Sequence, residues 1–360
     1  MNLKTQIKRS VLTCICLWTV YSASPGASAA EKPEITNPKM VWIPPGSFKL
    51  GSPTNEIGWI ALERQWTVTF RRGFFMAKHE VTQGEFLVLM EYNPSYFSAR
   101  KGFPEDLNSP VETVTWTEAS AYCAELNEVE EAAARLPSGW EYRLPTDGEW
   151  EYACRAGTTT PFHYGPDLRS GMANFNSQRG EYVQWKGNVA NAGGANLGKT
   201  TAVESYQPNA WGLYDMHGNV WEMCSTVGSE FTRIAFIDPP FLSPWTRTDL
   251  AGHLRGGAFS HDGGRCRSSY PGIFFANQPG VNYIGFRPVL APVQTATPLS
   301  FVPPALSEGQ LIINWIGPGT LQSADAITGP WTDVVRSWVN PLQTRAVPIR
   351  EAAKFYRLRE

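Results

Sequence analysis

Apolar and polar side chains alternate along residues 40–80 in the manner of β-strands. Residues 41–43 and 47–50 lie on either side of a Pro-Pro-Gly turn, and residues 65–70 place every second, apolar side chain on one face. A period of two is typical of strands that bury one face. The pattern therefore predicts three strands in this part of the chain.

Three helix starts follow along the chain. Thr82 and Thr146 are each followed three residues later by a glutamate and then by apolar residues. In such a capping box the threonine hydroxyl accepts a hydrogen bond from a first-turn amide, and the glutamate bonds back to the cap residue. A third helix is expected over residues 118–135, with Thr117 as its cap, because apolar residues recur there at helical spacing.

Residues 157–249 show no sustained period and are rich in Gly, Asn, Pro and Ser, yet they contain many aromatic side chains. A long segment without regular structure is either disordered or held in place by specific contacts and ions. The aromatic content favours the packed alternative. We therefore predict an α+β domain with low regular secondary structure over residues 40–292.

The composition changes after Leu290. Residues 293–304 are rich in Pro, Thr, Ala and Ser, which is typical of a linker. Residues 305–360 contain short β-like runs separated by turns, at 310–315, 320–322, 331–335 and 355–358. We predict a small C-terminal β-sandwich-like domain. It holds no cluster of His, Cys or carboxylates, which favours an adhesion, sorting or spacer role.

Residues 1–29 have the pattern of a cleavable signal peptide. Basic residues precede an apolar run at residues 10–21, which is too short to cross a bilayer, and small residues follow at 27–29. We expect residues 30–39 to be a linker. Since no other segment is long and apolar enough to be an anchor, the mature chain is expected to be secreted or periplasmic, without a membrane anchor.

The overall charge narrows the choice of partners. The chain has 31 basic and 33 acidic residues and a formal net charge of −2. A protein without a strong field of either sign is a poor partner for nucleic acid or an anionic membrane. We therefore expect no nucleic-acid partner.

Four cysteines remain once the signal peptide is removed: Cys123, Cys154, Cys224 and Cys266. An even number of cysteines in an oxidising compartment predicts disulfides, and three pairings are open. The alternative is four buried thiols in a large core.

The densest group of oxygen donors lies in residues 209–222. Asp215 and Glu222 supply carboxylates, and Gly218 allows a tight bend that turns carbonyl groups inward. Calcium takes six to eight oxygen ligands and tolerates irregular loops, so this segment is a candidate calcium loop. Carboxylates beside a glycine turn also occur as ordinary caps and turns.

A second group, residues 255–269, holds His261 and Cys266, both candidate metal ligands. Arg265 and Arg267 could lower the pKa of the Cys266 thiol. The alternative is a disulfide at Cys266 and a surface histidine. A Ser-His-Asp hydrolase is disfavoured, because three adjacent residues cannot face one another as a catalytic triad must.

Seven short segments occur in a fixed order along the chain: 40–51, 78–82, 110–116, 143–152, 212–222, 254–257 and 285–287. Together they resemble the sulfatase-modifying factor family, also called the formylglycine-generating enzyme family. The resemblance implies a variant C-type-lectin-like fold with little regular structure and bound calcium.

The best-known activity of the family oxidises a cysteine of a sulfatase to formylglycine, with copper, oxygen and two active-site cysteines. The resemblance places the second thiol at Cys266, but His261 stands at the position of the first, and Ala258 stands where active members have a serine. Copper(I) held between two thiolates needs both of them, so we expect no copper. Trp221, Ala258 and Arg265 fall at the substrate or ligand pocket.

The resemblance also assigns calcium ligands. The first site would use Asp215, Gly218, Val220 and Glu222. The second would use Asn174, Phe175 and Leu197. In both, some ligands are backbone carbonyl groups, as is usual for calcium.

Two functions remain open. The first is a calcium-stabilised domain that binds an extracytoplasmic protein, peptide or glycan, or a divergent oxidoreductase, without formylglycine-generating activity. The second is an active formylglycine-generating oxidase that matures sulfatases, in which Cys224 could replace the missing thiolate. A disulfide between Cys224 and Cys266 is the simpler expectation for that pair.

Overall fold

The structure is a computed structural model. It describes residues 32–35, 37–177, 196–227, 236–237, 251–275, 278–293 and six C-terminal strands. The chain divides into two compact units, one spanning 29–293 and one that includes 294–360. The predicted signal peptide lies outside the described residues. Among those residues, no helix has the length and apolar character needed to cross a membrane.

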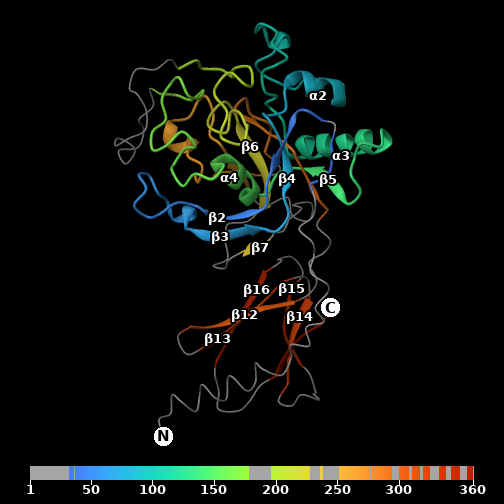
Figure 1. The fold of residues 1–360 in the computed structure, drawn as a ribbon, viewed down its shortest axis with the longest axis vertical. Helices are drawn as coiled ribbons and strands as arrows, with labels where there is room; N and C mark the ends of the chain where they lie inside the picture. The colour runs from blue at the N-terminus through green and yellow to red at the C-terminus, as the bar shows by residue number, and fades with distance from the viewer. Residues whose placement is uncertain are drawn as a thin grey trace. The chain divides into compact units, whose positions relative to one another are not determined.

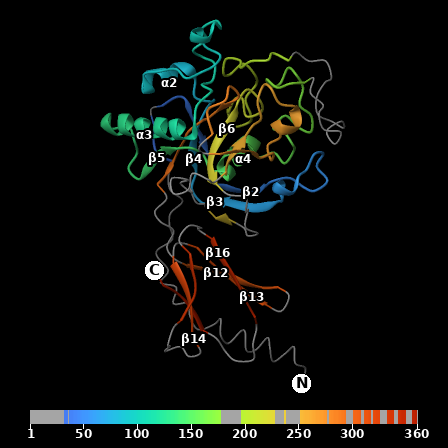
Figure 2. The ribbon, with the colours of Figure 1, turned by 180° about the vertical axis from the view of Figure 1, so that it is seen from behind.

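The larger unit mixes helices and strands (Figures 1 and 2). Its helices are α2 (Gln83–Met90), α3 (Trp116–Ala132) and α4 (Asp147–Arg155). Its strands are β1 (Met40–Ile43), β2 (Gly46–Leu50), β3 (Trp66–Phe70), β4 (Phe74–Ala77), β5 (Trp140–Arg143), β6 (Trp221–Val227), β7 (Phe236–Ile237), β8 (Ala251–Arg255), β9 (Gly272–Phe275), β10 (Ile284–Gly285) and β11 (Val289–Pro292). The three strands predicted near the N-terminus correspond to β1, β2 and β3.

These strands form three sheets, with the orders β1-β4-β11-β5, β10-β6-β8-β9 and β2-β3-β7. In the first sheet, Trp42 lies opposite Phe75, Phe75 opposite Leu290, and Leu290 opposite Tyr142. Residues paired in this way share one face of the sheet. Helix α3 contacts β5 at one edge of this sheet, and Figure 1 shows it there.

Each of the three α-helices begins with a capping box. Thr82 and Thr146 cap α2 and α4, as predicted. The predicted cap of α3 was wrong: Thr115 caps it, and the helix starts at Trp116. The reason is the position of Glu118, which lies three residues after Thr115 and whose carboxylate accepts a hydrogen bond from the Thr115 backbone amide at 2.7 Å.

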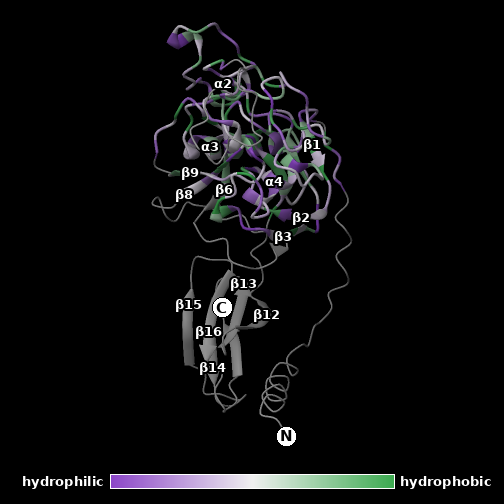
Figure 3. Cartoon of the chain, turned by 90° about the vertical axis from the view of Figure 1, so that its left-hand side faces the viewer, coloured by the Kyte–Doolittle hydropathy of each residue, from purple (hydrophilic) through white to green (hydrophobic). Residues whose placement is uncertain are grey.

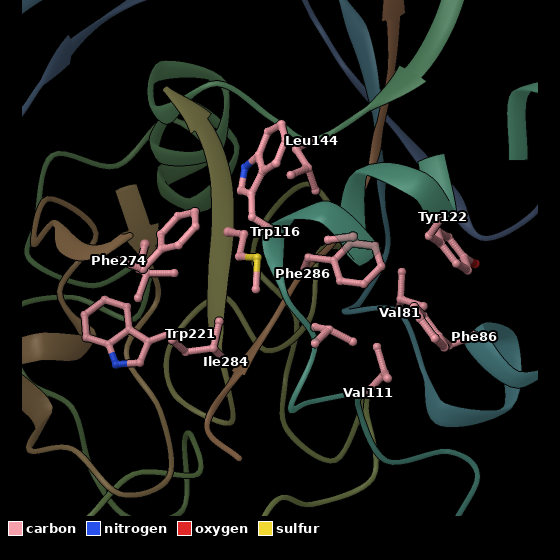
Figure 4. Packing of buried hydrophobic residues seen from close by; sticks show 14 of the residues in the cluster. Val81, Phe86, Val111, Trp116, Tyr122, Leu144, Trp221, Phe274, Ile284 and Phe286 are labelled. Carbon is pink, nitrogen blue, oxygen red and sulfur yellow. The ribbon is translucent and has the colours of Figure 1, made fainter. Parts of the chain in front are cut away.

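The core of the larger unit consists of several clusters of buried side chains. In Figure 4, Trp221 and Phe274 pack at one end of a buried cluster, and Phe86, Tyr122 and Phe286 pack at the other. The Phe86 and Tyr122 rings stack with centroids 5.7 Å apart. A second cluster gathers around Trp150 of α4. Burial of this many aromatic rings supplies much of the folding free energy of a loop-rich chain.

The loop-rich region is packed wherever the structure describes it. Tyr164 donates a hydrogen bond to the carbonyl oxygen of Met172 at 2.6 Å, and Asn209 donates to that of Ala153 at 2.8 Å. Buried ion pairs add to these contacts, among them Arg255 with Asp147 at 2.5 Å. Hydrophilic and hydrophobic residues are accordingly interleaved through the larger unit (Figure 3).

The described residues of the smaller unit are six strands: β12 (Ser300–Ser307), β13 (Gln310–Ile316), β14 (Gly319–Ala324), β15 (Thr332–Ser337), β16 (Leu342–Pro348) and β17 (Phe355–Arg359). They form two antiparallel sheets, β12-β13-β16 and β15-β14-β17. The predicted runs match β13, β14, β15 and β17. β12 begins inside the predicted linker, and β16 was not predicted.

Candidate functional site

The candidate calcium loop, residues 215–222, leads directly into β6. Its backbone turns three times through the left-handed region, at Asp215, Gly218 and Asn219. A Cβ atom at Gly218 would lie 2.2 Å from the carbonyl oxygen of Asn174, so this position requires glycine. The Asn219 amide also donates to that oxygen at 2.7 Å. The two segments predicted to bind calcium therefore lie side by side.

Glu222 lies at the end of this loop and is fully buried. Arg287 holds it with two hydrogen bonds of 2.6 Å, from Nε to Oε2 and from Nη2 to Oε1. Trp150 Nε1 donates a third, also of 2.6 Å, to Oε2. Glu222 is therefore anchored by three donors from two distant parts of the chain.

Two further buried carboxylates, Glu80 and Asp215, interact electrostatically with Glu222. We call these three residues the carboxylate cluster. Burial, followed by the charge of Asp215, raises the pKa of Glu80 well above its usual value. Burial also raises the pKa of Asp215 to about 6. Since Arg287 is the guanidinium that faces all three, the cluster carries more carboxylate than counter-charge and favours a bound proton or metal cation.

Two buried oxygen atoms near this cluster have no hydrogen-bond partner among the described residues: Oε2 of Glu80 and Oδ1 of Asn174. The Glu80 oxygen lies 4.0 Å from Arg287 Nη2. The Asn174 side chain is held through its other end, where Nδ2 donates to the carbonyl oxygen of Lys199 at 3.0 Å. A buried oxygen without a donor is costly, and a cation ligand is one way to satisfy it.

The donor set suits calcium only in part. Within the described residues, no group of three or more His, Cys, Asp or Glu side chains is arranged to hold a metal. The first calcium site would therefore depend on Asp215 and the carbonyl groups of residues 218 and 220, and the second on Asn174 and the carbonyl groups of residues 175 and 197. Glu222 is already engaged by Arg287 and Trp150, and Leu197 is 45% exposed. Both calcium sites stay predictions.

The second candidate region contains Trp221, His261 and Cys266, which we call the thiol region. Trp221 Nε1 donates to His261 Nδ1 at 3.3 Å, and Ser260 Oγ lies 3.2 Å from the same nitrogen. The His261 ring also packs edge-on against Trp221 and Tyr283. Because Nδ1 accepts from Trp221, a metal held by His261 would have to bind through Nε2.

Cys266 is fully buried at the end of the short turn Gly263–Cys266. Its side chain packs among apolar residues that include Phe162 and Phe175. Burial raises the pKa of the Cys266 thiol well above its ordinary value. The expected lowering by neighbouring arginines was wrong, because desolvation outweighs Arg265, and Arg267 pairs instead with Glu56 and Glu63.

The remaining predicted pocket residues lie on the same segment. Ala258 is buried, and its carbonyl oxygen accepts from the His261 amide at 2.9 Å. The Arg265 side chain is 26% exposed, and its Nε lies 3.7 Å from Asp262 Oδ2. Asp262 Oδ1 accepts from the Gly264 amide at 3.0 Å, an ordinary capping role that does not form a Ser-His-Asp triad.

The predicted disulfides are not formed. Cys123, Cys154, Cys224 and Cys266 are all buried free thiols. Cys224 packs in the cluster around Trp150, whereas Cys266 packs with Phe162 in another. Their separate surroundings explain why the expected pair is not joined, and they leave Cys266 without a bonded thiol partner.

A pair of histidines beneath the thiol region was not predicted. His217 Nδ1 lies 2.7 Å from the Cys266 carbonyl oxygen, and Nε2 accepts from the His163 amide at 3.1 Å. The two rings stack with centroids 4.8 Å apart. Burial lowers the pKa of His163 to about 4 and that of His217 well below its usual value. The two histidines next to the thiol region are therefore uncharged at neutral pH.

Glu80 and Arg287 were also missed as site residues. Both lie in segments already singled out, 78–82 and 285–287, but nothing in the sequence pairs them with residues 215–222. Their role comes from contacts between distant parts of the chain.

Residues 26–292 match the family described as "Sulfatase-modifying factor enzyme 1-like domain". Formylglycine-generating enzyme of Streptomyces coelicolor is 32% identical over 167 residues, which are 45% of this chain and 44% of that protein. The same enzyme of Mus musculus is 35% identical over 120 residues, 33% of this chain and 27% of that protein. The chain thus spans less than half the length of these curated relatives.

A solved structure, that of PvdO from Pseudomonas aeruginosa, is similar with a TM-score of 0.52 and 24% sequence identity. The similarity covers 70% of this chain and 94% of that one. At this level of identity it shows a shared fold.

Proposed function

The chain belongs to the sulfatase-modifying factor family, and from this premise we propose that it is an exported, calcium-stabilised binding domain without cysteine-to-formylglycine oxidase activity. The family match supports the fold of residues 40–292. The surroundings of Cys266 in the thiol region support the absence of cysteine oxidation to formylglycine. The partner in this proposal is an extracytoplasmic protein, peptide or glycan.

The observation that carries the proposal is the environment of Cys266. Copper(I) bound by two thiolates would need a second sulfur donor, and His261 stands where the resemblance places it. His261 Nδ1 is engaged by Trp221 at 3.3 Å, and Cys266 is fully buried as a free thiol. The residues present do not fit the copper centre.

The carboxylate cluster supports the calcium part of the proposal. Among the described residues, the three buried carboxylates outnumber the guanidinium that faces them, so a divalent cation could take the place of the protons that burial favours. In this proposal Asp215 is a side-chain ligand of the first calcium ion, and Oδ1 of Asn174, which has no hydrogen-bond partner among the described residues, is a ligand of the second. Bound calcium would stabilise these two neighbouring loops in a region with few helices and strands.

The finer architecture is part of the same proposal. Residues 40–292 would form a variant C-type-lectin-like domain, and residues 305–360 a small sandwich in which the two three-stranded sheets pack face to face. Residues 1–29 would direct export to the periplasm or the exterior, which suits a binding role.

A peptide assay tests the proposal. The purified mature chain is incubated with a Cys-x-Pro-x-Arg peptide, copper and oxygen, and the peptide mass is followed. Formylglycine-generating enzyme of Streptomyces coelicolor serves as the positive control. We expect no mass change with this chain. Conversion of the peptide cysteine to an aldehyde would show that the chain is an active oxidase and would overturn the proposal.

A further inference from the structure

A face of the sheet β1-β4-β11-β5 carries three large aromatic side chains that the proposed function does not use. Trp42 on β1 lies opposite Phe75 on β4, and Trp140 begins β5 two residues before Tyr142, on the same face. The Trp42 and Phe75 rings meet edge to face, with centroids 4.9 Å apart. The centroid of the Trp140 ring lies 6.1 Å from that of Phe75 and 6.5 Å from that of Trp42. We call these three rings the aromatic trio.

The helical layer covers this face unevenly. Leu126 and Leu136, in and just after α3, pack on the Tyr142 side, and Asn127 Nδ2 donates to the Tyr142 carbonyl oxygen at 2.8 Å. On the other side, Trp42 and Trp140 flank the buried Phe75 and remain partly exposed. An apolar side chain would be the usual cover for such a surface.

The apolar side chain of Ile35 packs against this surface, and a lysine lies over two of its rings. Nζ of Lys32 lies 5.8 Å from the centroid of the Trp42 ring and 5.7 Å from that of Phe75. Among the described residues, no carboxylate forms an ion pair with Lys32. The ammonium group is therefore stabilised by the negative faces of two rings, at distances where cation–π attraction is effective.

We propose that the aromatic trio is a binding site for an organic cation of the alkylammonium class, and that Lys32 occupies it from within the same chain. Aromatic faces attract cations, repel anions and accept methyl groups on nitrogen, so a methylated ammonium group matches this surface better than a neutral or acidic ligand does. The site shares no residue with the thiol region or the carboxylate cluster. A test of this site is therefore independent of the proposed function.

The position of Lys32 gives the site a built-in competitor. It is exposed and belongs to the short described segment 32–35, close in sequence to β1. A tethered group competes at high effective concentration with a ligand in solution. Removing the Lys32 charge should therefore raise the affinity of the site without altering the rings.

The test uses the full chain and calorimetric titration with choline. The neutral isostere 3,3-dimethylbutanol has the same shape without the charge. We expect Lys32→Met to bind choline about fivefold more tightly than the wild type, since removing the competing ammonium frees the rings. Both proteins should bind the neutral isostere more weakly than choline. Trp140→Leu in the Lys32→Met background should lose choline binding.

Lys39→Met is the matched control, because Lys39 is another exposed lysine of the same region, paired with Glu85 rather than with aromatic rings. It should bind choline as the wild type does. The comparison of Lys32→Met with the wild type decides the matter, since Lys32 is exposed and its replacement leaves the core intact. Equal choline affinity in those two proteins, or equal affinity for choline and its isostere, would overturn the proposal.

Discussion

The thiol region and the carboxylate cluster lie on neighbouring segments but differ in what the chain provides for them. In the thiol region, Trp221 holds His261 and apolar side chains surround Cys266. In the carboxylate cluster, Arg287 faces three buried carboxylates, and Oε2 of Glu80 has no hydrogen-bond partner among the described residues. The thiol region is thus filled by apolar and hydrogen-bonded side chains, whereas the carboxylate cluster holds more buried acidic groups than the guanidinium that faces it can pair.

The largest effect should come from removing Arg287, the guanidinium that faces the carboxylate cluster in the described part of the chain. Arg287→Met would leave Glu222 and Glu80 buried without a guanidinium, and we expect a loss of about 3–5 kcal/mol in the free energy of unfolding. Urea unfolding measures it. Lys39→Met, which breaks the exposed pair with Glu85, should cost less than about 1 kcal/mol. Equal losses in the two variants would mean that Arg287 does not hold the cluster together.

Calcium removal should have the next largest effect. If calcium is present at about 100 times its dissociation constant, chelation should lower the free energy of unfolding by about 3 kcal/mol and reduce the melting temperature. Asp215→Asn should lose most of this difference, while Glu105→Gln, at an exposed position, should keep it. A wild-type melting curve that does not change with excess chelator would remove calcium from the proposed function.

Local features of the fold were predictable from the sequence. Thr82 and Thr146 were identified as helix caps because a capping box depends on residues only three apart. Thr115 was missed because a second threonine, Thr117, lies two residues later and competes for the same role. Short-range rules thus located the elements but could not always choose between adjacent candidates.

The electrostatics of the candidate site could not be predicted in this way. Glu222 and Arg287 are 65 residues apart, and Arg267 reaches Glu63 across 204 residues. The sequence neighbours of Cys266 suggested a lowered thiol pKa, yet the fold turns Arg267 away and buries the sulfur. Such pairs form because the fold brings distant segments together. The sequence therefore indicated which side chains could take part in the site, but not which of them would contact one another.

The pH dependence of stability due to His163, next to the thiol region, should be a smaller effect than the loss of Arg287 or of calcium. Burial lowers the pKa of His163 from 6.5 to about 4, so the unfolded chain takes up this proton at a higher pH than the folded chain. The contribution of neutral His163 to the free energy of unfolding is therefore fully present above about pH 6.5. It is lost as the pH falls toward 4, by about 2 kcal/mol after allowing for partial exposure of the ring.

His163→Phe keeps an aromatic ring against His217 and removes the titration. Its stability should fall less than that of the wild type over the same pH range, as measured by urea unfolding at several pH values. Replacing His163 also removes its effect on the pKa of His217, so the difference between the two proteins reports on this pair of histidines. Identical pH profiles would show that the His163 ring is solvated, and would weaken the description of the thiol region as a neutral, filled site.

The smallest expected effect is the reaction of the native thiols with an alkylating reagent. Thiolate is the reactive form, and burial raises the pKa of Cys123 and Cys154 to about 12 and those of Cys224 and Cys266 well above the ordinary value. Treatment of the folded mature chain with iodoacetamide at neutral pH should therefore label none of the four. After unfolding in guanidinium chloride all four should react, which confirms that the reagent is competent. Rapid labelling of Cys266 alone in the folded chain, detected by peptide mass, would mean that the thiol region opens to solvent. The thiol region could then no longer be described as a filled site in contrast to the carboxylate cluster.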